Sequence, residues 1–171
     1  KNTCGTGGFW WVNTGEKPVE SKHILSATAA WKIGGKTTYA LEGGVVVGGA
    51  AVQWLRDGAR LIREADEINT LAASVADNGG VYFVPALSGM GAPYWDQYAR
   101  GSFFGITRCT SNGHLARAVL EGIAFQVYDI VKAMEADAGG ATAQLRVDGG
   151  ASQSDYLMQV QSDLFAFDIV R

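Results

Sequence analysis

The stretch Thr3-Cys4-Gly5-Thr6-Gly7-Gly8 runs directly into the apolar and aromatic residues Phe9-Trp10-Trp11-Val12. The segment from Thr6 to Val12 predicts a strand, and Asn13-Thr14-Gly15 predicts the turn that ends it. At the mouth of this strand, glycines would let the backbone approach a ligand closely, and threonine hydroxyls with backbone N–H groups would form a small cradle for an anion. An ordinary glycine-rich hairpin turn is the alternative that the stretch leaves open.

Two further strands are predicted next, over 23–31 and 37–41, with Gly34-Gly35 as the turn between them. Together with the first strand they predict an antiparallel meander. The segment from Ala30 to Thr37 also fits a relaxed phosphate-loop pattern. Bulky Trp31 and Ile33 would crowd such a loop, and the residues after Lys36 favour a strand instead of a helix, so we interpret the segment as a hairpin turn.

The remainder of the chain alternates helices with strands. Helices are predicted over 44–56, 65–75, 112–136 and around 157–164, and strands over 81–84, 101–107, 145–147 and 167–170. The longest helix is indicated by apolar residues at steps of three or four, and Gly139-Gly140 ends it. Three strands followed by such alternation indicate an α/β domain, and 171 residues suffice for one.

A second glycine turn, Asp148-Gly149-Gly150-Ala151-Ser152, lies between a predicted strand and a predicted helix. This arrangement places N–H donors and a helix N-terminus at one point, which suits an anion or a nucleotide. A plain strand-to-helix turn capped by Ser152 or Ser154 is the alternative. Gly49 and Gln53 are one helical turn apart and share a face, which by itself is also typical of packing.

Composition narrows the possible functions. Apolar residues are 47% and charged residues 18%, which excludes an intrinsically disordered chain. The net charge is −3 without a Lys/Arg cluster, so we expect no nucleic-acid partner. We expect no membrane partner either, because no apolar run approaches the ~20 residues that cross a bilayer. Cys4 and Cys109 are too far apart in sequence to suggest a disulfide scaffold, which favours a cytoplasmic location.

Six stretches, in the same order along the chain, resemble the C-terminal half of the glycerol-phosphorylating members of the FGGY carbohydrate kinase family. They are Lys1 to Gly7, Asn13 to Lys17, Tyr39 to Gly43, Gln53 to Asp57, Gly91 to Asp96 with Tyr98 to Gly101, and Arg146 to Gly150. The resemblance implies an α/β domain of the actin-like, ribonuclease-H-like ATPase fold, a mixed sheet with flanking helices. In that family two domains face each other across a cleft, and residues 1–171 would be most of the C-terminal, ATP-binding one, truncated at both ends and without the N-terminal sugar-binding domain.

The resemblance also implies roles for individual residues. Thr6 would contact the phosphates of ATP, Gly49 and Gln53 would line the nucleotide site, and Gly150 would meet the phosphates or the ribose. Ser154 would lie beside the adenine, at a position where the family often has Asn.

Phe9 would pack against the carbons of glycerol. The family's general-base aspartate and its magnesium ligands precede the segment that matches Lys1, so we expect neither a catalytic nor a metal-binding residue within 1–171. These inferences predict a piece of an ATP-dependent, glycerol-phosphorylating kinase that is inactive by itself. Its expected partners are Mg-ATP, glycerol, its own N-terminal domain and further copies of itself. The alternatives are an FGGY kinase for a pentulose or longer polyol, and a non-catalytic actin-like nucleotide-binding module.

Overall fold

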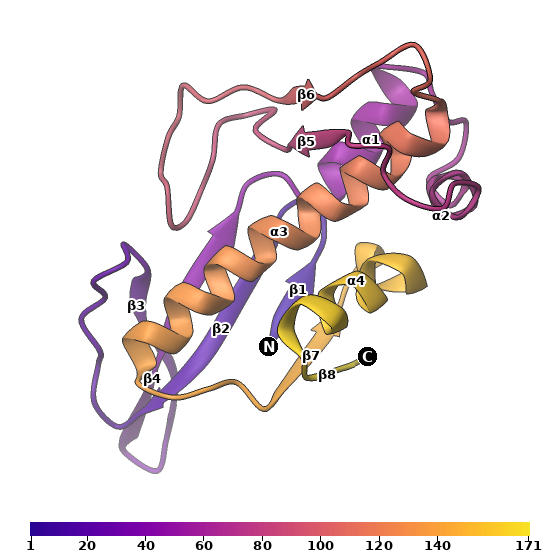
Figure 1. Ribbon diagram of the computed structural model, residues 1–171. Coiled ribbons are helices and arrows are strands. Elements are labelled where there is room, and N and C mark those ends of the chain that lie inside the picture. The colour runs from indigo at the N-terminus through magenta and orange to yellow at the C-terminus, as the bar shows by residue number, and fades with distance from the viewer.

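A six-stranded mixed sheet organises the computed structural model, which describes residues 1–171 (Figure 1). The strand order is β3-β4-β2-β1-β7-β8. Neighbours among β3, β4, β2 and β1 pair antiparallel, whereas β1–β7 and β7–β8 pair parallel. The predicted mixed sheet with flanking helices is thereby confirmed. The bounds are β1 (Asn2–Cys4), β2 (Gly8–Gly15), β3 (Ser26–Ile33), β4 (Lys36–Val45), β7 (Gln144–Asp148) and β8 (Asp168–Val170).

The first long strands are antiparallel as predicted, but they do not form a meander. β4 lies between β2 and β3 and pairs with both, from Gly8↔Val45 to Gly15↔Tyr39 on one side and along the β3–β4 hairpin on the other. The connection from β2 to β3 is long enough to carry β3 to the outer edge. Gly34 and Gly35 have φ of 57° and 81° at the hairpin tip, so the phosphate-loop pattern is a turn.

The helices are α1 (Gly49–Asp57), α2 (Glu67–Ala73), α3 (Asn112–Ala138), α4 (Asp155–Phe165) and the short 3₁₀ helix η1 (Gly150–Gln153). β5 (Tyr82–Val84) and β6 (Ser102–Phe104) pair in a separate small ribbon. The prediction that a helix starts at residue 44 is wrong, because Gly44 and Val45 complete β4. A short apolar run does not distinguish a buried strand from a helix.

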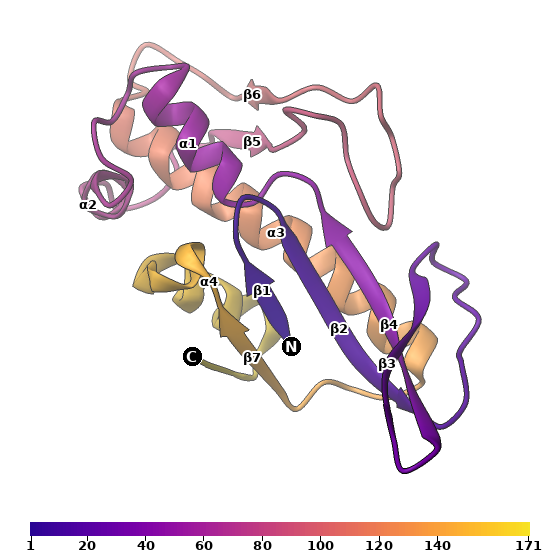
Figure 2. The ribbon, with the colours of Figure 1, turned by 180° about the vertical axis from the view of Figure 1, so that it is seen from behind.

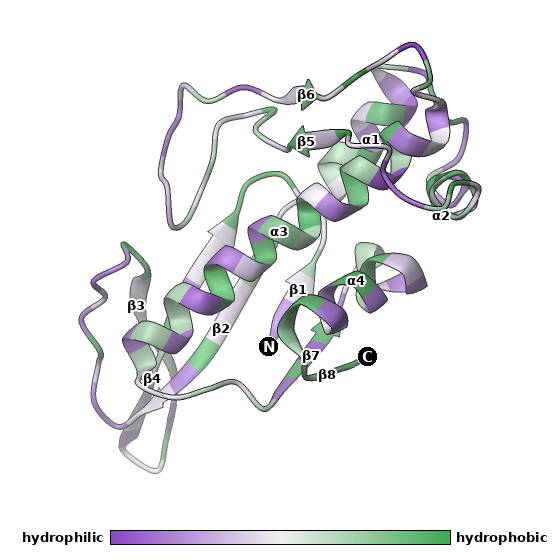
Figure 3. Cartoon of the chain, viewed as in Figure 1, coloured by the Kyte–Doolittle hydropathy of each residue, from purple (hydrophilic) through white to green (hydrophobic).

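Helix α3 covers one face of the large sheet, and α4 packs beside it (Figure 1). Seen from behind, the strands lie in front of α3 (Figure 2). Hydrophobic and hydrophilic residues alternate along α3 (Figure 3) because only one of its faces meets the core. That face carries Val119, Ile123, Val127 and Ile130, all at most 3% exposed. No helix of the protein, α3 included, has the combination of length and apolar character needed to cross a bilayer.

Asp137, in the last turn of α3, ties the β2–β3 connection to that helix. Its carboxylate is 1% exposed and accepts hydrogen bonds from the Ser21 hydroxyl, the Lys22 N–H and the His23 backbone N–H, and it bonds His23 Nδ1 at 2.7 Å. Burial alone would raise the pKa of Asp137, but these hydrogen bonds hold that pKa at about 2.

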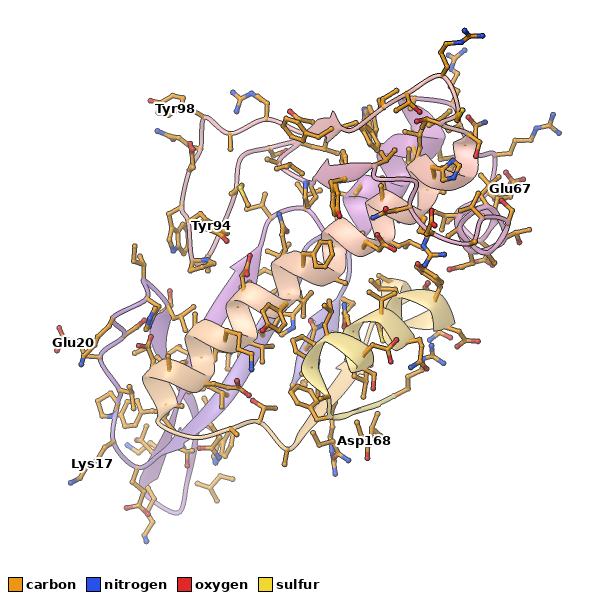
Figure 4. All side chains as sticks on the ribbon, in the orientation of Figure 1. Lys17, Glu20, Glu67, Tyr94, Tyr98 and Asp168 are labelled. Carbon is orange, nitrogen blue, oxygen red and sulfur yellow. The ribbon has the colours of Figure 1, made fainter.

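The loop after β5 is held at two points. Tyr94 donates a hydrogen bond from its hydroxyl to Asp129 of α3 at 2.7 Å, and Trp95 donates from its ring to the Ile24 carbonyl at 2.8 Å. The Asp129 carboxylate raises the pKa of Tyr94 to about 12. Tyr98 lies farther out on the same loop (Figure 4).

Candidate functional site

One cavity of about 320 Å³ brings together the five residues predicted to meet a nucleotide. Segments far apart in sequence form it: the β1–β2 turn, helices α1, α2, α3 and α4, and the 3₁₀ turn after β7. The five predicted residues on its wall are Thr6, Gly49, Gln53, Gly150 and Ser154.

The β1–β2 turn, Gly5–Gly7, presents free N–H groups beside this cavity. Its carbonyls are engaged: Gly5 accepts from the Gly49 N–H, and Thr6 accepts from the N–H groups of Gly48 and Ala50, all at 2.9 Å. The N–H groups of Gly5, Thr6 and Gly7 donate to no protein atom. A turn whose carbonyls are fixed to a helix N-terminus, and whose consecutive N–H groups stay available, is a typical anion-binding backbone.

Glycine at position 49 is explained by this packing. A Cβ there would lie 2.7 Å from the Gly5 carbonyl oxygen, so the backbones of turn and helix approach too closely for a side chain. Packing was the interpretation that the sequence pattern favoured for this position, and in the structure the group that approaches Gly49 closely is the protein's own backbone. Gly49 nevertheless lines the cavity, as does Gln53 one turn further along α1.

The second glycine turn has two glycines with different surroundings. Gly149 has φ 91° and ψ 170°, and a Cβ on it would lie 2.4 Å from the Cys4 carbonyl oxygen. Gly150 lines the cavity, and a Cβ on it would meet nothing within 4 Å. The first glycine therefore holds β7 against β1, while the second leaves open space on the cavity wall.

Beyond the two glycine turns, the cavity wall becomes apolar. Ile68 of α2, Leu120 and Ile123 of α3, and Leu157 of α4 line it and are at most 3% exposed. The cavity thus combines free backbone N–H groups with an apolar surface suited to a flat ring.

Ser154 is the N-cap of α4, as the sequence allowed. Its hydroxyl oxygen accepts the Leu157 N–H at 3.1 Å, and its hydroxyl hydrogen is donated to Asn69 Oδ1 at 2.5 Å. Asn69 also lines the cavity, although no sequence pattern marked it. Arg56, three residues after Gln53, is a further lining residue that the sequence analysis did not assign to the site. Its guanidinium is bidentate to Asp57, at 2.7 and 2.9 Å.

A polar network behind the apolar wall fixes α3 against α4. Glu121 accepts from Arg117 Nε at 2.9 Å, from Asn78 at 2.8 Å and from the Tyr156 hydroxyl at 3.1 Å. Burial, together with Glu121, raises the pKa of Tyr156 to about 12. Because Glu121 and Tyr156 are adjacent in sequence to Leu120 and Leu157, the network holds that wall in place.

Phe9 is not among the cavity residues. It lies on β2, on the face of the sheet opposite the core residue Trp10, and is 54% exposed. It is three residues beyond Thr6, so it projects near the same end of the sheet as the anion-binding turn. No group of three or more His, Cys, Asp or Glu side chains is placed to hold a metal ion.

Cys4, at the end of β1, is a buried free thiol, and burial raises its pKa to about 11. A thiol with that pKa stays protonated at neutral pH and is no nucleophile. Cys109 is free and exposed.

A model of the FGGY family of carbohydrate kinases, C-terminal domain, matches residues 1–171. Glycerol kinase of Dichelobacter nodosus is 68% identical over 171 residues, which are the whole of this chain and 34% of that protein. Glycerol kinase of Dechloromonas aromatica is 60% identical with the same coverage. The chain spans about a third of the length of these curated relatives.

Among solved structures, Plasmodium falciparum glycerol kinase with ADP superposes with a TM-score of 0.91 at 40% identity, over 98% of this chain and 34% of that one. A ligand-bound xylulose kinase from Lactobacillus acidophilus gives a TM-score of 0.84 at 30% identity, with the same coverage.

Proposed function

The chain belongs to the FGGY family of carbohydrate kinases, and from this premise we propose that it forms the nucleotide-binding half of a glycerol kinase. The reaction would be the transfer of the γ-phosphoryl group of ATP to a hydroxyl of glycerol, giving ADP and glycerol 3-phosphate. The observation that carries the proposal is the cavity in which Thr6, Gly49, Gln53, Gly150 and Ser154 meet. The named relatives at 68% and 60% identity favour glycerol as the acceptor.

Within this proposal, the polarity of the cavity orients the nucleotide. The free N–H groups of Gly5, Thr6 and Gly7 would bind phosphate oxygens, and the open space at Gly150 would let the chain of phosphates pass close to the backbone. The apolar wall of Ile68 and Leu157 would take the base. In phosphoryl transfer, positioning and stabilisation of charge provide most of the catalysis, and a rigid backbone cradle provides both.

Phe9 would contribute to the acceptor side. Its exposed ring could pack against the carbons of glycerol, since it stands at the end of the sheet that carries the phosphate cradle. The acidic, histidine and cysteine side chains of this chain form no group that could hold a metal ion. We propose that the general base and the ligands of the Mg²⁺ expected with ATP come from the remaining part of the protein.

The domain assignment follows the same reasoning: residues 1–171 would be most of the ATP-binding domain, packed against an N-terminal sugar-binding domain. We propose a cytoplasmic enzyme, which the two free cysteines favour. Self-association is also proposed, and large apolar side chains exposed on the surface, including Ile33 and Tyr98, favour it.

The test is an acceptor panel with the full-length protein and Mg-ATP. Glycerol, xylulose and gluconate are supplied separately, and the phosphorylated product is identified by mass spectrometry. The proposal expects turnover with glycerol, and preferential turnover of xylulose would establish the pentulose-kinase alternative. ATP binding without turnover of any acceptor would favour the non-catalytic module. The 171-residue chain, assayed in parallel, should form no glycerol 3-phosphate.

A further inference from the structure

The hydroxyl of Ser154 has no hydrogen left for a ligand. It has one hydrogen, which is donated to Asn69 Oδ1 of α2, and its oxygen accepts the Leu157 N–H that caps α4. Ser154 is only 9% exposed, so water does not compete freely for these bonds. At this point of the cavity, a donor to a bound molecule has to come from a neighbouring side chain.

Asn69 is the neighbour that the Ser154 hydroxyl contacts directly. An amide side chain has one acceptor oxygen and one NH₂ group, and the contact with the Ser154 hydroxyl determines which end is which. Because Oδ1 faces Ser154, the two N–H groups of Nδ2 occupy the other side of the amide, and they donate to no protein atom. Asn69 lines the cavity, so its amide group is available there, with its free donors on the side turned away from Ser154.

The surroundings of Asn69 determine what it can recognise. Its neighbours on the wall include Ile68, Leu120 and Leu157, which offer an apolar surface for a flat ring. The anion-binding N–H groups belong to the Gly5–Gly7 turn, on a different element. Although the wall also carries polar residues such as Asp66 and Gln153, a neutral donor beside this apolar surface suits a neutral acceptor, such as a ring nitrogen of a base, better than a phosphate oxygen.

We propose that Asn69 is a specificity-determining residue of the nucleotide site, donating from Nδ2 to a ring nitrogen of the purine, and that Ser154 is the positioning residue that sets its amide orientation. This inference rests on the proposed nucleotide-binding function and refines it. In this proposal Ser154 does not bind the nucleotide directly. Its hydroxyl orients the Asn69 amide, and that amide donates the hydrogen bond to the base.

The experiment measures discrimination between ATP and analogues that lack one ring nitrogen. Dissociation constants and KM values are determined with the full-length protein for ATP and for its 1-deaza, 3-deaza and 7-deaza analogues. The wild-type protein should bind one of the three about three- to tenfold more weakly than ATP, the value of one neutral hydrogen bond. Asn69→Ala should weaken ATP binding by the same factor, with kcat little changed, and should bind that analogue and ATP equally well.

Two further variants separate positioning from folding. Ser154→Ala frees the Asn69 amide to rotate and should reduce the discrimination, whereas Ser154→Thr keeps a hydroxyl at the N-cap and should preserve it. Thr70→Ala, next to Asn69 on α2 but outside the cavity, controls for effects of substitution in that helix. Melting temperatures of all variants identify any loss of fold.

The outcomes are distinct. If wild-type protein binds ATP and all three analogues alike, or if Asn69→Ala discriminates as the wild type does, the inference about Asn69 is wrong while the kinase assignment stands. If the wild-type protein binds no adenine nucleotide, the proposed function itself fails.

Discussion

Adjacent Gly149 and Gly150 should respond to the same substitution in opposite ways. Alanine at 149 would force a side chain into a region of φ and ψ that only glycine occupies readily, at a cost of about 1–3 kcal/mol. Its Cβ would also lie 2.4 Å from a backbone oxygen of Cys4, and such overpacking costs about 1–3 kcal/mol more. We therefore expect Gly149→Ala to destabilise the protein by about 2–6 kcal/mol and to lower its Tm.

Alanine at 150 should leave the fold intact. Its Cβ would enter open space, and replacing glycine at an unstrained position even stabilises by about 0.4–1 kcal/mol. The cost should appear in ligand binding, because the new methyl group occupies the wall along which the nucleotide passes. Gly150→Asp adds a negative charge facing phosphate, and repulsion at about 4 Å costs about 1–4 kcal/mol at intermediate dielectric.

The assay combines thermal unfolding with calorimetric titration of ATP into the full-length protein. Gly149→Ala should lose stability, and Gly150→Asp should lose at least about tenfold in ATP affinity at an unchanged Tm. A Gly150→Asp variant that binds ATP as the wild type does would show that the second glycine turn is only structural. A Gly149→Ala variant with wild-type Tm would refute the strain argument.

Three further substitutions test other parts of the reasoning. Thr6→Val should raise the KM for ATP, or lower kcat, about tenfold or more, because it removes a phosphate contact. Its Tm should not change, because the exposed Thr6 side chain has no protein partner. Unchanged ATP kinetics would refute the assignment of Thr6. Phe9→Ala should raise the KM for glycerol and leave that for ATP unaffected, and steady-state kinetics with each substrate varied in turn would reveal the opposite pattern. Asp137→Asn should cost about 2 kcal/mol in urea unfolding at pH 7, because folding lowers that pKa from 3.8 to about 2. This contribution to the free energy of unfolding is present above pH 4 and is lost as the pH falls toward 2. Between pH 4 and pH 2, Asp137→Asn should therefore lose less stability than the wild type. The exposed Asp168→Asn is the control, and an equal fall in the free energy of unfolding of the two variants over this interval would contradict the account.

Helix α3 shows why part of the fold was predictable. Its apolar repeat persists over many turns, Ser111 and His114 form a capping box at its start, and Gly139 ends it with φ 73°. The predicted range, 112–136, differs from the observed Asn112–Ala138 only at its last turn. Local signals of this kind are contained in the segment itself, so they can be interpreted without knowing what packs against it.

The sheet order was not predictable in this way. Whether β4 or β3 pairs with β2 depends on which of them hydrogen-bonds to the free edge of β2, and nothing local in the sequence decides that long-range pairing. β1 has only three residues, too few to show an alternation of apolar and polar residue types, and β6 ends at Phe104 because Gly105 turns with φ 79°. Propensity is weak evidence for elements this short, because pairing partners decide them.

The candidate site, like the fold, could be predicted from the sequence only in part. Its glycine turns could be recognised because each is a local pattern between a strand and a helix, whereas Asn69 meets Ser154 across 85 positions of sequence and left no local pattern. The glycines themselves are ambiguous evidence for a ligand, since Gly49 and Gly149 are required by carbonyl groups of the protein's own backbone. A binding turn differs from a packing turn in that its N–H groups donate to no protein atom. In the Gly5–Gly7 turn, the carbonyls of Gly5 and Thr6 accept hydrogen bonds from the start of α1, while three consecutive N–H groups stay free beside an apolar-walled cavity, an arrangement that packing alone does not require.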